Sequence, residues 1–326
     1  MEDASAPRPG FFSRLLKGDA RTKQEPVRTV RVSVNAYGKL PIYKDFISSG
    51  LTEPGAREFR NWIDRGFSHL WSSDDARKER DIARHVFLLR LPESGAYVAG
   101  CLWGSGDAGG LRRFPFTLFT VLPGGHRAAD LLAATEHLEV FNRQADAVAE
   151  RFGPGGSLDG FYRTYRGAEL DLPVKPAKRI EREARAELEG VPIASLARGL
   201  FAESAATRWP ALLSGLDQAA DPSAPTATPT LLPLSGALPR PRELQFWLLR
   251  LSRAGSRRRD VDGILYHARG ERGRALLLWR GLRAEDFLSL DTRPSEPEPP
   301  AASPASSESA APTAGFEQPL SSLLSA

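Results

Sequence analysis

Three apolar runs lie close together in residues 85–122, HVFLLRLPESGAYVAGCLWGSGDAGGLRRFPFTLFTVL. They are His85 to Leu91, Tyr97 to Trp103 and Phe114 to Leu122. Each run is short and rich in β-branched or aromatic residues, which is the composition of a strand. The first two are joined through Pro92-Glu93-Ser94-Gly95, and a connection this short keeps consecutive strands side by side. The stretch therefore predicts an antiparallel meander.

Amphipathic helices are predicted on both sides of this meander in the sequence. One begins at Thr52-Glu53-Pro54, where a capping hydroxyl and a first-turn proline precede apolar residues at helical spacing. Another runs from about Arg127 to Phe152 and ends at a glycine-rich stretch. Shorter helices are predicted over Lys178 to Glu189, Ile193 to Phe201 and Ala284 to Leu290.

Further strands are predicted beyond the helical block, at Leu244 to Leu251, Ile264 to Ala268 and Ala275 to Trp279. Strands that precede and follow a helical block can join one sheet. We therefore expect an α/β fold, with a single layered domain over residues 29–290 in which helices flank a mostly antiparallel sheet. A Pro-rich loop is expected near residues 219–242.

Both ends of the chain differ in composition from this domain. Residues 1–28 mix Pro, Gly, Lys and Arg without sustained periodicity and are expected to form a flexible N-terminal arm. Residues 291–326 are rich in Pro, Ser and Ala and are expected to form a disordered tail. The tail ends with apolar residues spaced as one side of a short helix, which hints at a partner contact: Phe316, Leu320, Leu323 and Leu324.

Composition limits the functional classes. The 326 residues carry a formal net charge of +4, and no apolar run approaches the length that spans a bilayer. The N-terminus shows no secretory signal pattern, so a cytoplasmic protein without membrane insertion is expected. The arginines near Arg257 are followed at once by Asp260 and Asp262, so a solvated loop is favoured over a nucleic-acid site. The single cysteine, Cys101, lies in a predicted strand and is expected to be a buried, inert thiol.

A turn-forming segment precedes the first helix, Tyr37-Gly38-Lys39-Leu40-Pro41-Ile42-Tyr43-Lys44-Asp45-Phe46. It follows a β-branched run, Val30 to Val34. Gly38 permits a positive φ or a close backbone approach, Pro41 stops a helix or ladder, and Asp45 is placed to accept backbone N–H bonds. Two interpretations stay open, a structural corner without a function of its own and part of a functional site.

A glycine-rich loop connects the second and third predicted strands, Gly104-Ser105-Gly106-Asp107-Ala108-Gly109. Its spacing matches a dinucleotide-binding motif, but a strand follows it instead of the helix whose N-terminus would face a pyrophosphate. A hydrolase or transferase that uses Ser105 and Asp107 is the alternative function, although Ser105 lacks the strand-to-helix elbow of such nucleophiles. The five histidines show no ligand spacing, so neither a metal nor a cofactor is expected.

Three ordered motifs resemble the TagF (ImpM) family of bacterial type VI secretion-associated proteins. The first is Tyr37 to Pro41 followed by Asp45-Phe46, although Lys44 stands where the family usually has glycine. The second lies in the glycine-rich loop, with Ser105, Asp107, Gly110, Arg112, Phe114 and Pro115. This chain has one extra residue before Phe114, so either Arg112 or Arg113 stands for the family arginine. The third is Leu276 to Leu282 with Glu285, Asp286 and Phe287, and Trp62 and Gly66 of the first helix also fit.

The resemblance implies a non-enzymatic cytoplasmic regulator of a type VI secretion system that acts by protein–protein contact. It further implies post-translational repression of the apparatus, a forkhead-associated scaffold protein as partner, and a longin- or profilin-like layer. The binding surface is expected to use Lys39, Asp45, Asp107, Arg112 and Arg113. The residues expected to shape it are Tyr37, Gly38, Pro41, Phe46, Trp62, Gly110, Phe114 and Pro115.

Overall fold

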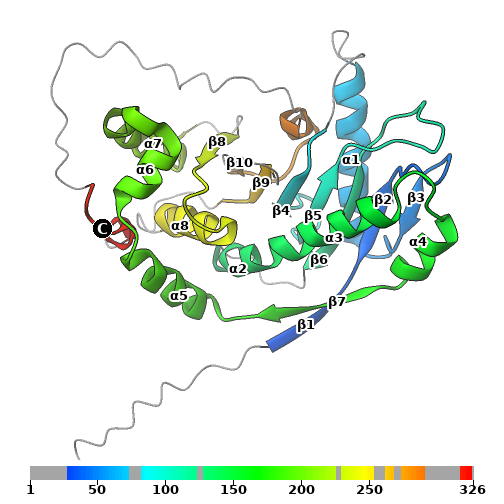
Figure 1. Ribbon diagram of the computed structural model, residues 1–326, viewed down its shortest axis with the longest axis horizontal. Coiled ribbons are helices and arrows are strands. Elements are labelled where there is room, and N and C mark those ends of the chain that lie inside the picture. Colours follow the sequence, from blue (N-terminus) through cyan, green and yellow to red (C-terminus); the bar gives the residue numbers. More distant parts are fainter. Residues whose placement is uncertain are drawn as a thin grey trace, which may run out of the picture.

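An eight-stranded antiparallel sheet forms the centre of the molecule (Figure 1). The computed structural model describes residues 28–72, 82–122, 128–224, 229–252, 261–267, 273–290 and 316–324. Along the sheet the strand order is β3-β2-β6-β5-β4-β9-β10-β8. The strands are β2 (Asn35–Gly38), β3 (Ile47–Ser49), β4 (His85–Arg90), β5 (Tyr97–Trp103), β6 (Phe116–Leu122), β8 (Thr230–Leu234), β9 (Gly263–His267) and β10 (Gly273–Leu278).

The meander predicted for residues 85–122 is confirmed. Strand β5 pairs antiparallel with β4 on one side and with β6 on the other. Strands from beyond the helical block extend the same sheet, because β4 also pairs with β9, with Val86 opposite Tyr266. The expectation of one α/β layer with a mostly antiparallel sheet is therefore confirmed.

Both faces of the sheet are buried, which explains the nearly continuous apolar strands. In β4, Val86 and Leu88 face one core cluster, whereas Phe87 and Leu89 face another. Side chains alternate between the two faces of a strand, so a strand that is covered twice loses the alternation of apolar and polar residues. The sheet is thus the middle of three layers.

One long helix covers the face that includes Phe87. This helix is α1 (Pro54–Ser72), and it begins at the proline that the sequence predicted. The short 3-10 helix η5 (Ala284–Leu290) packs beside it, where Phe287 contacts the ring of Trp62. The first helix and the last element of the domain are therefore neighbours although about 200 residues separate them.

Helices from the middle of the chain cover the opposite face (Figure 1). The helix predicted from about Arg127 to Phe152 is interrupted by a 3-10 turn, and the predicted helices over Lys178 to Glu189 and Ile193 to Phe201 are confirmed. The elements are α2 (Ala128–Ala134), η3 (Thr135–His137), α3 (Leu138–Arg151), α4 (Leu158–Tyr165), α5 (Ala177–Glu189), α6 (Ile193–Phe201), η4 (Ala202–Ser204), α7 (Ala205–Ala219) and α8 (Arg240–Ser252). A separate ribbon pairs β1 (Arg28–Ser33) with β7 (Glu169–Val174).

Two predictions for the region after α6 are wrong. Leu244 to Leu251 form most of helix α8 and not a strand. The helix is buried on nearly all sides, so its sequence shows no amphipathic period by which it could be predicted. The Pro-rich loop expected near residues 219–242 contains strand β8. Pro233 is tolerated there because β8 is the last strand of the sheet and, among the described strands, pairs with β10 alone.

The segment Phe316 to Leu324 lies against the chain's own helices, where η6 (Leu320–Leu324) is seen beside α5 (Figure 1). Leu320 and Leu324 are fully buried in the core cluster that contains α5, α6 and α8. The amide of Ile193 donates to Gln318 O at 2.9 Å, and the amide of Leu320 donates to Val191 O at 2.8 Å. The expectation of a disordered tail is therefore wrong for residues 316–324.

The structure does not describe most residues of the two expected flexible ends. Most of the expected arm, residues 1–27, and most of the expected tail, residues 291–315, lie outside the described residues. Arg28 already begins β1.

Across the described residues, no helix combines the length and apolar content that crossing a bilayer requires. Cys101 is buried as expected, and this burial raises the pKa of its thiol to about 12.

Candidate functional site

Three motif segments that are distant in sequence meet beside helix α1. The corner, residues 37–46, leaves strand β2, and the glycine loop, residues 104–115, connects β5 to β6. The third segment, residues 280–287, includes the start of η5. The corner and the glycine loop contact each other directly, and all three segments contact helix α1. The sequence motifs predict them only as separate turns.

Gly38 fixes the distance between the corner and the glycine loop. Its φ is +130°, and a Cβ built there would lie 2.0 Å from the carbonyl oxygen of Pro115. No side chain fits in that space, and an L-residue rarely adopts this φ. The close backbone approach expected at Gly38 is therefore confirmed, and its neighbour is the Pro115 of the second motif.

Asp107 organises the glycine loop from inside. Its carboxylate accepts hydrogen bonds from Arg112 Nε at 2.8 Å and from the Leu111 amide at 3.1 Å, and only 5% of the residue is exposed. The Arg112 guanidinium holds the pKa of this carboxyl below its usual range, and the backbone donors add to the effect. Gly110, with φ +65°, supplies the left-handed turn at the tip of the loop.

Arg112 also connects the loop to the corner. Its guanidinium donates to the carbonyl oxygen of Lys44, and the amide of Ala108 donates to Tyr43 O at 3.0 Å. Arg112 and not Arg113 therefore pairs with the motif aspartate. Lys44 replaces the family glycine without adopting a positive φ, since the non-glycine residues with positive φ in the described chain are Leu51 and Ala202.

An aromatic cluster fills the space between the corner, the loop and α1. The ring of Phe114 makes edge contacts with Tyr37 at 5.9 Å and with Phe46 at 4.8 Å between centroids. It also contacts Phe67 of α1 at 4.7 Å, and Phe67 in turn stacks on Trp71 at 5.6 Å. Such pairs stabilise a packing arrangement beyond the area that they bury, so the cluster stabilises the packing of the corner and the loop on α1.

Lys39 lies inside this cluster. The residue is 3% exposed, and its Nζ lies 4.4 Å from the centroid of the Phe46 ring. Within the described chain the ammonium has no hydrogen-bond partner. A buried cation without a hydrogen-bonding partner is costly, and the cation–π contact with Phe46 offsets part of that cost.

Tyr37 connects the corner to the polar side of α1. Its hydroxyl donates to Asp64 Oδ1 at 2.6 Å, and the guanidinium of Arg60 lies 4.9 Å from its ring centroid. Burial raises the pKa of Tyr37, and the bond to the Asp64 carboxylate raises it further. Tyr37 is therefore a neutral hydrogen-bond donor at physiological pH.

The third motif also packs against α1 through a hydrogen bond and a close approach at a glycine. Trp62 Nε1 donates to the carbonyl oxygen of Arg283 at 2.7 Å. Gly66 leaves room for Phe287, since a Cβ at Gly66 would lie 2.5 Å from that side chain. Asp286 is 1% exposed and binds both terminal nitrogens of Arg280 at 2.8 Å. This buried pair fixes the turn that carries Phe287.

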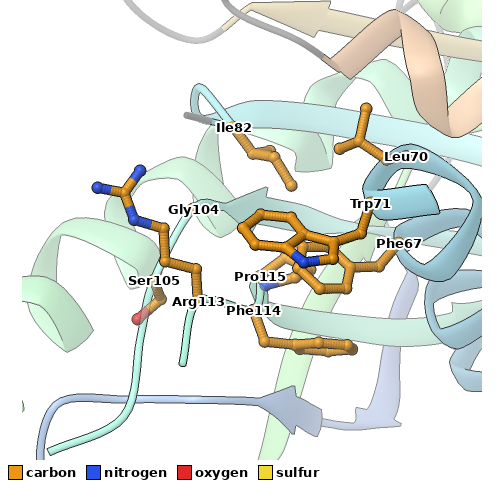
Figure 2. Close-up of a pocket in the computed structure, with 9 residues that line it drawn as sticks. All are labelled: Phe67, Leu70, Trp71, Ile82, Gly104, Ser105, Arg113, Phe114 and Pro115. Carbon is orange, nitrogen blue, oxygen red and sulfur yellow. The ribbon is translucent and has the colours of Figure 1, made fainter. Parts of the chain in front are cut away.

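A small pocket lies between the aromatic cluster and the glycine loop (Figure 2). Its cavity volume is about 20 Å³, which is space for roughly one water molecule. Figure 2 shows the indole of Trp71 at its centre, with the polar ends of Ser105 and Arg113 directed away from that ring. The lining residues are Phe67, Leu70, Trp71, Ile82, Gly104, Ser105, Arg113, Phe114 and Pro115, and they include no histidine. In the described chain no group of three or more His, Cys, Asp or Glu side chains is placed to hold a metal.

The residues expected to form a binding surface divide by exposure. Asp45, Arg112 and Arg113 are exposed, and Asp45 Oδ1 accepts a hydrogen bond from the Phe46 amide, as its predicted role required. Lys39 and Asp107 are buried and shape the site from inside. We define the corner-loop surface as the exposed charged and large apolar residues of the two segments, Lys44, Asp45, Phe46, Leu111, Arg112 and Arg113.

Sequence reasoning did not assign Leu111, Phe67 and Trp71 to the site. Leu111 is 89% exposed at the tip of the loop, next to two arginines. A large apolar residue inside a Gly- and Arg-rich turn is the signal that identifies it. Phe67 and Trp71 are four positions apart at the end of α1, so the sequence indicates that they share one face of the helix. It does not indicate that this face contacts Phe114 of the glycine loop.

Comparison with known proteins supports the family resemblance for part of the chain. Residues 35–163 match the family model of the TagF N-terminal domain, described as type VI secretion system-associated. No curated protein matches the chain. Among solved structures, the crystal structure of PA0076 from Pseudomonas aeruginosa PAO1 matches with 22% identity and a TM-score of 0.34, covering 45% of this chain and 74% of that one.

Proposed function

Because residues 35–163 match the model of the TagF N-terminal domain, described as type VI secretion system-associated, we propose that the protein regulates such a system by protein–protein contact. It acts in the cytoplasm without catalysing a reaction, and it represses the apparatus post-translationally. The corner-loop surface is the contact region. A forkhead-associated scaffold protein of the same system is the first partner to test.

The exposure of apolar side chains carries this proposal. Among the described residues, the exposed large hydrophobic side chains are Phe46, Trp71, Leu111, Leu231 and Leu288. Three of these five belong to the corner, the glycine loop and the adjoining end of α1, where Lys44, Arg112 and Arg113 are also exposed. Aromatic residues and arginine are enriched in protein interfaces, whereas scattered single apolar residues need no explanation.

The close packing of the corner and loop backbones also favours a contact surface. Gly38, Asp107 and Arg112 lock the corner against the loop, and the Phe114 ring anchors both to α1. A preorganised surface loses less conformational freedom on binding, so more of the contact energy is available as affinity. By contrast, the hydrolase or transferase alternative gains no support from the pocket, which has little volume and no histidine among its described lining residues.

A secretion assay tests the proposal. In the bacterium that encodes the protein, extra copies are expected to lower the amount of a type VI secreted protein in the medium. The variant Phe46→Glu/Leu111→Glu is expected to lose this effect, because it places two carboxylates in the apolar part of the surface. Leu231→Glu is the matched control, since Leu231 is 53% exposed on strand β8 and lies outside the corner-loop surface.

Two results would overturn the proposal. One is equal repression by the wild-type protein and Phe46→Glu/Leu111→Glu, with both proteins folded to the same melting temperature. The other is secretion that does not change at all when the protein is deleted or supplied in excess. Co-precipitation with the forkhead-associated protein then identifies or excludes that partner.

A further inference from the structure

We propose that the corner-loop surface recognises an acidic protein segment, and that one carboxylate of this segment pairs with the buried ammonium of Lys39. This inference rests on the proposed function and specifies the chemistry of the partner. The carboxylate reaches Lys39 when the ring of Phe46 turns aside.

The state of Lys39 is the first observation behind this inference. Its Nζ is buried and has no hydrogen-bond partner among the described residues, although an ammonium can donate three hydrogen bonds. Buried charges in proteins are normally paired or hydrogen-bonded. A carboxylate is the group that satisfies such a cation best, through a charge-assisted hydrogen bond. Lys39 therefore has an unfilled binding capacity at the edge of a surface.

The position of Phe46 supplies the route to Lys39. Phe46 is 40% exposed, and the ring that contacts the ammonium also stacks on Tyr37 at 5.7 Å between centroids. Its backbone lies in the corner, outside any helix or strand. Rotation of one partly exposed side chain is a fast and small motion. It replaces the cation–π contact by an ion pair.

The charges around Phe46 select an anionic partner. Lys44 and Arg113 are exposed and take part in no ion pair within the described chain. Arg112 has an exposed side chain although it also binds Asp107. Of the nearby acids, Asp107 is bound by Arg112, Asp64 by Tyr37 and Arg60, and Asp45 alone is exposed in the corner. The balance of exposed charge is positive, which steers acidic segments to this surface.

An experiment on labelled lysines tests this site directly. The full chain is prepared with carbon-13 at the lysine side chains, and Lys39→Met assigns the Lys39 signal. The probe is a terminally blocked hexapeptide, Glu-Glu-Leu-Asp-Glu-Leu, and its matched control carries Gln and Asn at the acidic positions. At constant ionic strength, the acidic peptide is expected to shift the Lys39 signal saturably, and the neutral peptide is not.

Variants measure how much Lys39 contributes. Lys39→Met is expected to weaken binding of the acidic peptide about tenfold, as expected when a hydrogen bond between charged groups is lost. Lys178→Met, which removes an exposed lysine from α5, should leave the affinity unchanged. Phe46→Ala removes the cover and is expected to let acetate alone shift the Lys39 signal at a lower concentration than in the wild type.

Stability separates binding from a structural role. If Lys39 serves only to hold Phe46, Lys39→Met lowers the melting temperature, which would contradict the inference. If it is a ligand site, the melting temperature stays equal or rises, because an unpaired buried charge is replaced by an apolar side chain of similar length. A shift of Lys44 without a shift of Lys39 would also overturn the inference, since the acidic peptide would then bind exposed charges only.

The proposed function is tested separately from this site. If Lys39→Met represses secretion as well as the wild type while Phe46→Glu/Leu111→Glu does not, the inference is wrong and the proposed function stands. If single-stranded RNA of the same charge shifts Lys39 as strongly as the acidic peptide, the assignment of the ligand to a protein is wrong.

Discussion

Two apolar surfaces of this molecule are built from distant segments, but one is covered by the chain itself and the other is exposed. The surface on α5, α6 and α8 is covered by the chain itself, through Leu320 and Leu324. The corner-loop surface keeps Phe46 and Leu111 exposed next to arginines. The covered surface buries two leucines and is joined by backbone hydrogen bonds, whereas the open one leaves a phenylalanine and a leucine exposed beside cations. The second composition is typical of contacts between molecules, and the first of contacts within one.

Loss of the close approach at Gly38 is expected to break the open surface most strongly. In Gly38→Ala the new methyl group meets Pro115 O, and the residue must hold φ +130°. We expect the free energy of unfolding to fall by about 4 kcal/mol, from backbone strain and overpacking together. Gly110→Ala is the matched control, because its φ is +65° and no atom lies within 4 Å of the added Cβ. It should cost about 1 kcal/mol. Urea denaturation measures both, and equal losses would show that the contact with Pro115 is unimportant.

The buried pair behind the third motif gives the next largest effect. Asp286→Asn removes one carboxylate that binds Arg280, in a site where Asp286 is 1% exposed. Breaking a buried pair in this way should lower the free energy of unfolding by about 3 kcal/mol. Asp171→Asn removes an exposed partner of Arg31 and should leave thermal unfolding unchanged. Similar melting temperatures for the two variants would contradict the importance of this turn for the packing on α1.

The covered surface is expected to open locally in Leu320→Ala. Leu320 is fully buried, so its truncation should weaken docking of residues 316–324 by about 2 kcal/mol. The amides of Ile193 and Ala194 donate to Gln318 O and Phe316 O, so their hydrogen exchange should become faster while β4 is unaffected. Glu317→Ala, at an exposed position of the same segment, should not change this exchange. Faster exchange throughout the sheet would mean that the segment supports the whole fold.

Acid is expected to loosen the glycine loop with the smallest effect. The pKa of Asp107 is lower in the folded protein than in the unfolded chain, mainly because of Arg112. Its stabilising contribution is therefore complete above pH about 4 and is lost as the pH falls through the lowered pKa. Hydrogen exchange of the Leu111 amide, which donates to Asp107, should rise relative to other loops in this range. Asp107→Asn should remove the dependence, and an unchanged acid response in this variant would assign it to another group.

The elements that sequence analysis predicted are those with a visible period or a short connection. The meander follows from the short turn between its first two strands, and α1 from the spacing of Phe59, Trp62 and Phe67. Helix α8 was predicted as a strand because burial on all sides removes the helical period. Strand β8 was missed because Pro233 and its neighbours resemble a loop, and its position at a sheet edge is a tertiary property.

The candidate site was predicted in composition but not in arrangement. The motifs contain Gly38, Asp107 and Arg112, and local turn chemistry gives each a role. No local pattern predicts that Lys39 is buried or that Arg112 binds the corner. Both depend on contacts between segments about 70 residues apart. Among the site residues that sequence analysis missed, the exposed Leu111 is the one that its position in a Gly- and Arg-rich turn could have identified.

The pairing of β4 with β9 also has a consequence for synthesis on the ribosome. Val86 pairs with Cys101 on one side and with Tyr266 on the other, so one neighbour arrives early and the other much later. At about 5–20 residues per second, β9 follows β4 by roughly ten to forty seconds. During that time the nascent chain has a β4 edge without its native neighbour, and such edges pair readily with other chains. The growing polypeptide is therefore most exposed to aggregation before its last strands are made. Residues 35–163, which match the family model, are already complete at that stage.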